Sequence, residues 1–417
     1  MSRNRKYLPF LMWAFPLLFF TYQFILRLWP GLMMTQIMEQ FSIDASSFGL
    51  LAALYYYGYS GMQIPIAIML DRFSARYVIF IFTIICGIAA FAFNYTDNWY
   101  VACLSRFFIG VGSAVGFLGV SKVVSDWFPK EQYAKMIGYS FTIGLMGAIY
   151  GGKPVSLLIE HYSWQTISLA LALFSIIIGC STYLFLRSNT SAELKTEKEE
   201  QFRLVHFKKL LSSPIIWFIA IANLLMVGSL EGLGDVWGVQ YLITTYGLAK
   251  PEAAELISFV FVGMIISGPL LALLSKYIGN YKVITLCGIG MAIAFILILS
   301  SQHYNWYYFA TLFFLIGVMC CYQVIVFAAG AELVKVQLLG VTIAFLNCVN
   351  MLGGSFFHTI IGRAMDIFWS GDIGSDGLRL YNSEAYANAL MVIPICSIIG
   401  ALIIAAVGYK LKKAKND

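Results

Sequence analysis

Long runs of apolar residues, separated by short polar turns, fill almost the whole sequence. Within each run the apolar residues are continuous and do not alternate with polar ones, which predicts helices instead of strands. Many runs are long enough for a helix to cross roughly 30 Å of hydrocarbon. Because no water satisfies backbone groups there, a spanning segment must be a helix or part of a closed barrel. The pattern predicts an all-α membrane protein with twelve spanning helices, over residues 8–37, 47–70, 77–95, 98–125, 134–158, 164–187, 214–243, 253–275, 282–301, 306–330, 339–365 and 385–408.

Composition supports this prediction and excludes a soluble protein. Apolar residues make up 60% of the chain and charged residues 12%, whereas soluble domains carry about 25% charged residues. The eight cysteines all lie in apolar runs without metal-type spacing. We interpret them as reduced packing residues and expect neither disulfides nor a cofactor. The net charge of +6 reflects basic residues beside the membrane and does not indicate a nucleic acid partner.

The distribution of lysine and arginine predicts the orientation in the membrane. If the amino end is cytoplasmic, inner segments hold 20 of the 27 basic residues, outer segments hold 2, and 5 lie within spans. Basic residues concentrate in cytoplasmic loops of membrane proteins, so we expect both termini to face the cytoplasm, in a bacterial inner membrane. The basic amino end enters the first apolar run without a small-residue cleavage site, which favours an uncleaved first span.

A long polar segment, residues 188–213, divides the apolar runs into two sets of six. Its mixed charges predict a solvated cytoplasmic linker, with one six-helix bundle over residues 1–187 and another over residues 214–417. The two halves also resemble each other. LDRFSARY at 70–77 aligns with LSKYIGNY at 274–281, and IGYSFTIGLMGAIYGG at 137–152 aligns with LGVTIAFLNCVNMLGG at 339–354.

A charged hairpin follows the second expected span, where an apolar helix stops at Asp71-Arg72 and another begins just after Arg76. This segment resembles the G-x-x-x-D-R-x-G-R-R loop of the major facilitator superfamily. It departs from that motif at three positions, Ala67, Ser74 and Ala75. A carboxylate at a helix end needs partners such as nearby arginines or the amino end of another helix, so we expect Asp71 to be paired.

A second motif lies in the fourth expected span, where Arg106, Gly110 and Gly112 fit the R-x-x-x-G-x-G pattern of the same superfamily. Glycines at this spacing let helix backbones approach closely. The fifth span is glycine-rich as in that superfamily, but Lys153-Pro154 stands near the place of the antiporters' Gly-Pro step. The resemblance covers nearly the whole chain. It implies two pseudo-symmetric six-helix bundles with the substrate at mid-membrane, and structural or gating roles for Asp71, Arg72, Arg76, Arg106, Gly110 and Gly112. For Arg106, a part in proton transfer is the alternative.

Arg27 lies deep in the first expected span, with Gln23 one turn before it on the same face. A charge at the bilayer centre costs at least about 2.5–3.5 kcal/mol, so it needs a partner or a water-filled cavity. The stretch YQFILRLWPGLMMTQIMEQFSI is similar to a region of the superfamily's anion:cation symporter branch, whose arginine binds the anionic group of the substrate. The guanidinium suits this role because its fork of donors meets a carboxylate in two places. The alternative is a structural arginine that pairs with a neighbouring helix.

Two acids lie in the seventh expected span. Glu231 and Asp235 are four residues apart and so share one helical face. Close or desolvated carboxylates have a raised proton affinity, which makes Glu231 the first and Asp235 the second candidate for proton coupling. The alternative is that the span ends early and both acids face the outer water. His358, in the eleventh span, is a third candidate because histidine titrates near neutral pH, although such a histidine more often hydrogen-bonds between helices.

Further polar side chains in the spans are candidates for substrate contacts. The resemblance places spans 1, 4, 7 and 10 around the superfamily's cavity, which favours Tyr322 and Gln323 in span 10. The aromatic stripe in span 2 is more often packing. We expect the substrate to contact Arg27, Gln23, Tyr57, Asn223, Tyr322, Gln323 and Asn350.

These observations favour a secondary transporter that takes up a small polar solute, such as an amino acid, a peptide or an organic anion, by proton-coupled symport. We expect a monomer in the lipid bilayer that works by alternating access. YQFILR, MQIP and GDVWGVQYL are also similar to branches that include the phagosomal nutrient transporters. An exporter or antiporter of the same fold and a transporter-like receptor are alternatives. The sequence has no G-x-x-x-x-G-K-[ST] motif for ATP-driven transport, and its scattered histidines without H-E-x-x-H argue against an intramembrane enzyme.

Overall fold

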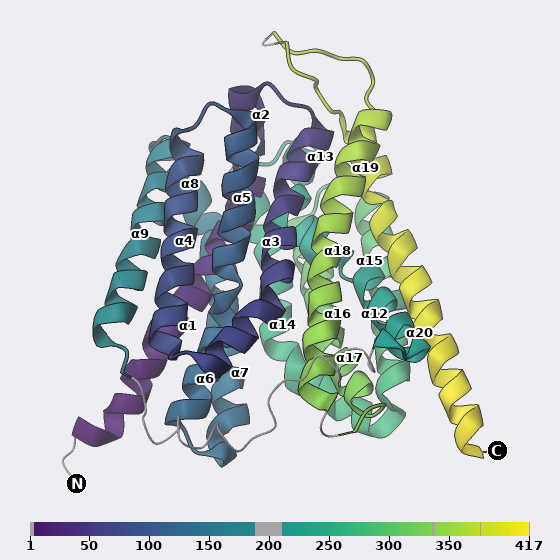
Figure 1. Cartoon of the computed structure of the whole chain (residues 1–417). Coiled ribbons are helices and arrows are strands. Elements are labelled where there is room, and N and C mark those ends of the chain that lie inside the picture. The colour runs from purple at the N-terminus through teal and green to yellow at the C-terminus, as the bar shows by residue number, and fades with distance from the viewer. Residues whose placement is uncertain (1–3, 188–210, 336–337, 376, 417) are drawn as a thin grey trace. The chain divides into compact units, whose positions relative to one another are not determined.

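The computed structural model describes residues 4–187, 211–335, 338–375 and 377–416. Figure 1 shows them as helices joined by turns, and their one β contact is an isolated bridge between Ile373 and Arg379. The prediction of an all-α membrane protein is confirmed. The helices are α1 (Asn4–Leu32), α2 (Met34–Phe41), α3 (Ala45–Arg72), α4 (Ala75–Tyr95), α5 (Trp99–Ser113), α6 (Val115–Trp127), α7 (Lys130–Gly151), α8 (Lys153–His161), α9 (Trp164–Phe185), α12 (Pro214–Met226), η1 (Ser229–Trp237), α13 (Gly238–Tyr246), α14 (Lys250–Ile278), α15 (Asn280–Leu299), α16 (Trp306–Cys320), α17 (Tyr322–Ala331), α18 (Leu339–Ile367), α19 (Ser383–Leu390) and α20 (Val392–Asn416).

Eleven helical stretches in the described ranges are long and apolar enough to cross a membrane. The second expected span is not among them, because its tyrosines and Gln63 lower its mean hydropathy. It nevertheless forms one helix, α3, of 28 residues. At 1.5 Å per residue this helix measures roughly 42 Å, which exceeds the hydrocarbon thickness of about 30 Å. With α3 included, the number of spans matches the predicted twelve.

Two compact units make up the chain. The first contains Met1–Trp29 and Leu54–Gln201, and the second contains Pro30–Ala53 and Phe202–Asp417. The boundary between the units therefore passes through α1 and α3. The expected linker at 188–213 lies almost entirely outside the described residues, and the division into bundles at 1–187 and 214–417 stays a prediction.

Each unit is held together by helices that run along one another. In the first unit α4 packs along α5 and α9, where the Ser175 hydroxyl of α9 donates to the Thr83 carbonyl oxygen of α4 at 2.9 Å. In the second unit α14 packs along α16, and α20 packs along α12 and α15. There the Ser397 hydroxyl of α20 donates to the Gly288 carbonyl oxygen of α15 at 2.8 Å. Such bonds satisfy polar side chains inside an otherwise apolar core.

The two units repeat the same local structure. Asn98 caps α5 and Asn305 caps α16, and each is followed by Trp-Tyr as the helix begins. Both helices then end at a single turn residue, Ala114 or Cys321, before the chain continues as α6 or α17. The fourth and tenth expected spans are thus interrupted at corresponding places. This agrees with the internal repeat that the sequence predicts.

One glycine crossing also occurs in both units. A Cβ at Gly110 would lie 2.7 Å from the Tyr55 carbonyl carbon, and a Cβ at Gly317 would lie 2.7 Å from the Val260 carbonyl carbon. Each glycine therefore lets one helix, α5 or α16, touch the backbone of another, α3 or α14. Backbone approach of this kind is the usual way in which small residues hold membrane helices together.

The first and seventh expected spans also differ from the observed helices. The segment 214–243 is not one regular α-helix, because it contains a π-helical stretch, η1, between α12 and α13. The sequence of η1 and its N-terminal cap holds three glycines, which weaken the preference for a regular α-helix. The first expected span ends at Leu32 and not at residue 37. The chain turns at Met33 and continues as α2, so the predicted end was wrong.

Candidate functional site

Arg27 lies in α1 with its guanidinium between two aromatic rings. The guanidinium carbon is 5.5 Å from the ring centre of Phe24 and 5.5 Å from that of Tyr56 in α3. The side chain is 7% exposed. Both rings can hold a cation through their electron-rich faces, an interaction that strengthens when water is excluded. The surroundings thus support the positive charge of Arg27.

Gln23 precedes Arg27 by one helical turn and is held by a second tyrosine. The Tyr55 hydroxyl donates to Gln23 Oε1 at 3.0 Å, and Gln23 is 2% exposed. A Cβ at Gly116 of α6 would lie 3.4 Å from the Cγ of Gln23. With Oε1 engaged by Tyr55, the amide donates through its Nε2 group. Gln23 and Arg27 are therefore neighbouring donors on one face of α1.

Arg106 fixes the backbone next to Arg27. From α5 it donates through Nη1 to the Leu26 carbonyl oxygen at 2.8 Å and through Nη2 to the Arg27 carbonyl oxygen at 3.2 Å. Its guanidinium carbon also lies 4.7 Å from the ring centre of Tyr55, and the side chain is 1% exposed. These contacts join α5 to α1 and α3. They support the structural role that the sequence favours for Arg106.

Tyr57 is exposed, unlike the neighbouring tyrosines of α3. Its side chain is 44% exposed, whereas Tyr55 and Tyr56 are each 1% exposed. Successive residues of an α-helix point about 100° apart, so the neighbours in the tyrosine run face different surroundings. The tyrosines that contact Arg27 and Gln23 are Tyr56 and Tyr55. The sequence shows the run of tyrosines in this span, but it does not show which of these tyrosines face α1.

Glu231 and Asp235 lie in η1 and are buried. Their side chains are 0% and 3% exposed, and the helix continues beyond them through α13. Neither acid faces water in this structure, which does not fit the alternative that the span ends before them. Glu231 interacts electrostatically with the Tyr322 hydroxyl and the Cys320 thiol. π-Helical turns inside longer helices are frequent at functional sites.

Three amide side chains and one phenol of the second unit lie on α12, α17 and α18. The Tyr322 hydroxyl of α17 donates to the Asn223 carbonyl oxygen of α12 at 3.1 Å. Asn350 Nδ2 of α18 donates to Gln323 Oε1 at 3.1 Å. In the described part of the chain, both amide atoms of Asn223, together with Gln323 Nε2 and Asn350 Oδ1, have no hydrogen-bond partner. A buried polar group without a partner costs about 1–3 kcal/mol, so these amides are unusual.

His358 lies elsewhere on α18. It is fully buried, and its carbonyl oxygen is the atom that a Cβ at Gly49 would meet first. The residue is therefore part of a close helix contact. Among the described residues, no group of three or more His, Cys, Asp or Glu side chains could hold a metal ion.

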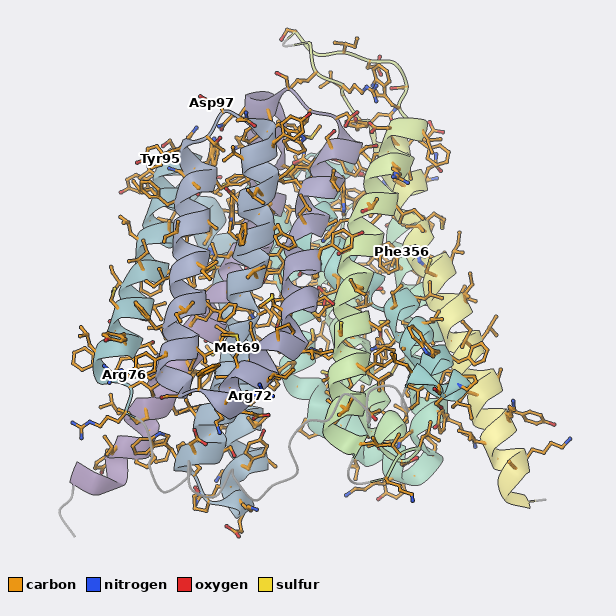
Figure 2. The ribbon with its side chains drawn as sticks, viewed as in Figure 1. Met69, Arg72, Arg76, Tyr95, Asp97 and Phe356 are labelled. Carbon is orange, nitrogen blue, oxygen red and sulfur yellow. The ribbon has the colours of Figure 1, made fainter. Side chains whose placement is uncertain are left out.

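The charged hairpin lies at the end of α3. Figure 2 shows Met69, Arg72 and Arg76 at one end of the first unit, and Tyr95 and Asp97 at its opposite end. The Arg76 guanidinium carbon lies 4.6 Å from the ring centre of Tyr183 in α9.

Asp71 lies just beyond the expected span. Burial raises the pKa of Asp71, and nearby Lys122 partly lowers it. Lys122 itself pairs with Asp126 at 3.2 Å.

The second motif glycine, Gly112, lets α5 approach α4, because a Cβ there would lie 2.6 Å from the Phe82 carbonyl oxygen. The motif residues thus lie at helix contacts and at a helix end.

Comparison with known proteins identifies the family. The Major Facilitator Superfamily model matches residues 14–358. The chain is 23% identical over 360 residues to the membrane sensor protein UhpC of Salmonella typhimurium, an alignment that covers 79% of each chain. It is 23% identical over 266 residues to the hexuronate transporter of Escherichia coli, covering 58% of this chain and 60% of the transporter. Some other bacterial transporters align over about a third of their length.

Solved structures agree with the fold. A mutant of the nucleoside transporter NupG superposes with a TM-score of 0.75 at 13% sequence identity, covering 95% of this chain and 99% of NupG. The family consists of membrane transporters, which excludes the interpretation as an intramembrane enzyme. The chain is multi-pass, is built on the transporter fold, and belongs to the Major Facilitator Superfamily.

Proposed function

We propose that this protein carries a small organic anion of the sugar-acid type across the bacterial inner membrane by alternating access, with proton symport. The observation that supports this most is the buried guanidinium of Arg27, which lies near the Phe24 and Tyr56 rings on a turn of α1 whose backbone Arg106 holds. An arginine held in this way presents its donor fork at a fixed place on α1. A carboxylate is the group that meets such a fork in two places.

Gln23 adds a second recognition element for the anion. Tyr55 holds its Oε1, so Nε2 is the group left to donate beside Arg27. A ligand that offers an oxygen next to its carboxylate would use both donors. Sugar acids have this arrangement, and a relative that aligns over more than half of this chain is named a hexuronate transporter.

The unpartnered amides of the second unit support a ligand with several hydroxyl groups. Asn223 offers both a donor and an acceptor, Gln323 offers the donor Nε2, and Asn350 offers the acceptor Oδ1. Hydroxyl groups can donate and accept, so they match amides better than apolar groups do. We propose Asn223, Gln323 and Asn350 as contacts for these hydroxyl groups, with Tyr322 positioning α12 through its bond to the Asn223 carbonyl oxygen.

Glu231 is the proposed proton carrier, with Asp235 second and His358 third. The Glu231 carboxyl is fully buried in η1, and a desolvated carboxyl binds a proton more readily than an exposed one. Its electrostatic neighbours include a phenol and a thiol. Both of these groups are neutral at physiological pH, so they add no positive charge that would favour the carboxylate.

Uptake into proteoliposomes tests the role of Arg27. We expect Arg27→Ala to lower the uptake of D-glucuronate at least 100-fold, and Arg27→Lys to lower it about tenfold because a point charge replaces the fork. Arg363→Ala is the matched control, since this arginine also lies in a spanning helix but its side chain is exposed. If Arg27→Ala transports as well as Arg363→Ala, Arg27 does not bind the substrate.

An imposed pH gradient tests the proton carrier in the same vesicles. We expect Glu231→Gln to retain downhill exchange of the anion but to lose its acceleration by a pH gradient. Asp235→Asn, whose carboxyl lies one turn further along η1, separates the contributions of the two acids. A Glu231→Gln protein whose uptake still responds fully to the gradient would remove Glu231 from the coupling.

A solute sensor is the second candidate, because the UhpC relative aligns over 79% of this chain and is named a membrane sensor protein. Binding and uptake separate the two candidates. A transporter both raises its melting temperature with D-glucuronate and accumulates it in proteoliposomes. A sensor shows the first response without the second.

A further inference from the structure

The first turns of α3 belong to the second unit, whereas the rest of the same helix belongs to the first. The helix is continuous from Ala45 to Arg72, and its one internal proline, Pro65, lies well after the boundary at Ala53. If one unit moves against the other, this helix must therefore change in one of two ways. Either α3 bends near Ala53, or residues 45–53 leave their partners in the second unit.

Asp366, near the end of α18, caps the amino terminus of α3. Its Oδ2 accepts from the Ser46 backbone N–H at 2.9 Å and from the Ser46 hydroxyl. Its Oδ1 accepts from the Tyr381 hydroxyl, whose oxygen accepts from the Ala45 backbone N–H at 3.0 Å. The first N–H groups of a helix lack partners within it, and negative charge is favoured there. The Ser47 backbone N–H instead donates to the Asp44 side chain at 2.9 Å. Asp366 and Tyr381 thus satisfy the first two N–H groups of α3.

Arg379 completes this polar group on its outer side. Its Nη1 donates to Asp366 Oδ1 at 3.1 Å and lies 4.0 Å from Asp44 Oδ2. Its guanidinium carbon lies 4.6 Å from the ring centre of Trp369. The Arg379 side chain is 39% exposed and that of Asp366 is 15% exposed. The network therefore borders water, and water can take over its hydrogen bonds when it opens.

Below the cap, α3 and α18 touch through small residues. A Cβ at Gly362 would first meet the Ala45 carbonyl oxygen, and a Cβ at Gly49 would first meet the His358 carbonyl oxygen. One turn further along α3, the Ser355 hydroxyl donates to the Ala53 carbonyl oxygen at 3.1 Å. Small residues at this spacing form a smooth surface with few interlocking side chains. Such a surface can separate and close again without repacking large side chains.

The same part of the chain also contacts η1. The Phe48 ring packs edge-to-face on Trp237 with ring centres 5.8 Å apart, and a Cβ at Gly31 would lie 2.7 Å from the Val236 Cα. η1 carries both Glu231 and Asp235. The segment around the first turns of α3 thus meets the element that we propose for proton binding.

We propose that Asp366 and Tyr381 form a releasable latch on α3, which holds residues 45–53 to α18 in one state of the transport cycle and frees them in another. The inference rests on the alternating access proposed above. It does not depend on the identity of the substrate, nor on the roles of Arg27 and Glu231. Ala45, Ser46, Asp366 and Tyr381 make up the latch.

The latch is built to be stable yet reversible. Burial and the hydrogen bond to Asp366 raise the pKa of Tyr381, so its hydroxyl keeps the proton that it donates. Hydrogen bonds to a charged group are stronger than neutral ones, which favours the closed state. The exposed side of Arg379 and the small-residue contact favour release, because neither leaves a buried charge or a large cavity.

Thiol labelling of the purified protein in nanodiscs tests the latch without any substrate. Ser355→Cys is the reporter, since Ser355 is 1% exposed and lies against Ala53. The same protein without this substitution gives the background from the eight native cysteines. We expect Asp366→Asn and Tyr381→Phe each to raise the rate of maleimide labelling tenfold, which corresponds to about 1.4 kcal/mol in the opening equilibrium.

Asp372→Asn is the matched control. Asp372 lies in the same loop region and accepts a hydrogen bond from Ser370, so its substitution removes an equal charge outside the latch. Tyr381→Phe keeps the ring and removes only the hydroxyl, which guards against a variant that merely misfolds. The proposal is overturned if both latch variants, Tyr381→Phe and Asp366→Asn, are labelled no faster than Asp372→Asn while their melting temperatures are unchanged.

Cross-linking tests whether release is required for transport. In a Ser46→Cys/Asp366→Cys protein, a short bifunctional thiol reagent joins α3 to α18, and we expect D-glucuronate uptake to fall at least tenfold and to recover when a cleavable linker is cut. The two single-cysteine proteins treated alike are the controls. Unchanged uptake after full cross-linking would overturn the latch. If the parent protein does not transport D-glucuronate, the labelling experiment decides alone, because failure of the proposed function and failure of the latch give different results.

Discussion

At the scale of single residues, the sequence predicts that Arg27 is buried but does not predict its contacts. A lone arginine within an apolar run predicts a buried charge, because little else explains it there. The run does not reveal that Phe24 and Tyr56 flank the guanidinium, nor that Arg106 donates to the carbonyl oxygen of Arg27 itself. These contacts depend on how α1, α3 and α5 meet, and that is set by packing across the unit.

Tyr55 provides a prediction at this scale. Tyr55→Phe removes the donor to Gln23 Oε1 while it keeps the buried ring, so Gln23 loses its fixed orientation. Loss of a hydrogen bond to a buried polar group costs about 1–3 kcal/mol. We expect the KM for D-glucuronate uptake to rise roughly 5- to 150-fold, with little change in the maximal rate.

Tyr57→Phe is the control for this substitution, because Tyr57 is exposed on the same helix. An increase in KM that is equal in the two variants would show that Tyr55 does not act through Gln23.

At the scale of elements, the helices themselves follow from the apolar runs, but their interruptions do not. The stretch that becomes η1 reads SLEGLGDVW, and its glycines weaken an α-helix without specifying what replaces it. The matching caps at Asn98 and Asn305, each before Trp-Tyr, could have been found in the sequence as a further sign of the repeat. The breaks at Ala114 and Cys321 carry no local signal of comparable strength.

A substitution at the glycine crossing tests the packing of α5 on α3. A Cβ at Gly110 would lie against the Tyr55 carbonyl group, whereas a Cβ at Gly138 of α7 would have nothing within 4 Å. Overpacking costs about 1–3 kcal/mol, and each kcal/mol shifts the melting temperature by roughly 2–4 °C in domains of ordinary size. We expect Gly110→Ala to lower the melting temperature by roughly 2–12 °C in detergent.

Gly138→Ala serves as the reference for that experiment, because alanine favours a helix over glycine and meets no neighbour there. Equal melting temperatures for the two variants would contradict the close crossing of α5 and α3.

At the scale of the whole molecule, composition and charge predict the class of protein, and the motifs predict the family. What they do not predict is that residues 30–53 join the second unit. A division based on the polar segment at 188–213 assumes that each half packs with itself. The contacts of Ser46 with Asp366, 320 residues away, arise only from the folded arrangement. The orientation in the membrane still rests on the distribution of basic residues.

Labelling of intact cells tests this orientation. We expect a cysteine at Asp97 to react with a membrane-impermeant maleimide from outside, and a cysteine at Phe73 to react only after permeabilisation. Both side chains are exposed, so burial does not explain a difference. Phe73 directly follows Arg72, which lies at the end of the first unit opposite to Asp97. Labelling of Phe73→Cys but not of Asp97→Cys in intact cells would reverse the predicted topology.

The cap on α3 has a consequence for how the chain matures. Ser46 leaves the ribosome long before Asp366 and Tyr381 have been synthesised, and chains generally fold from the amino end as they emerge. The start of α3 must therefore enter the bilayer with the Ala45 and Ser46 backbone N–H groups solvated, and these receive Tyr381 and Asp366 as partners only late in biogenesis. A chain that stops before α18 is complete lacks these hydrogen bonds. The first turn of α3 would then be frayed when quality-control proteases encounter the chain.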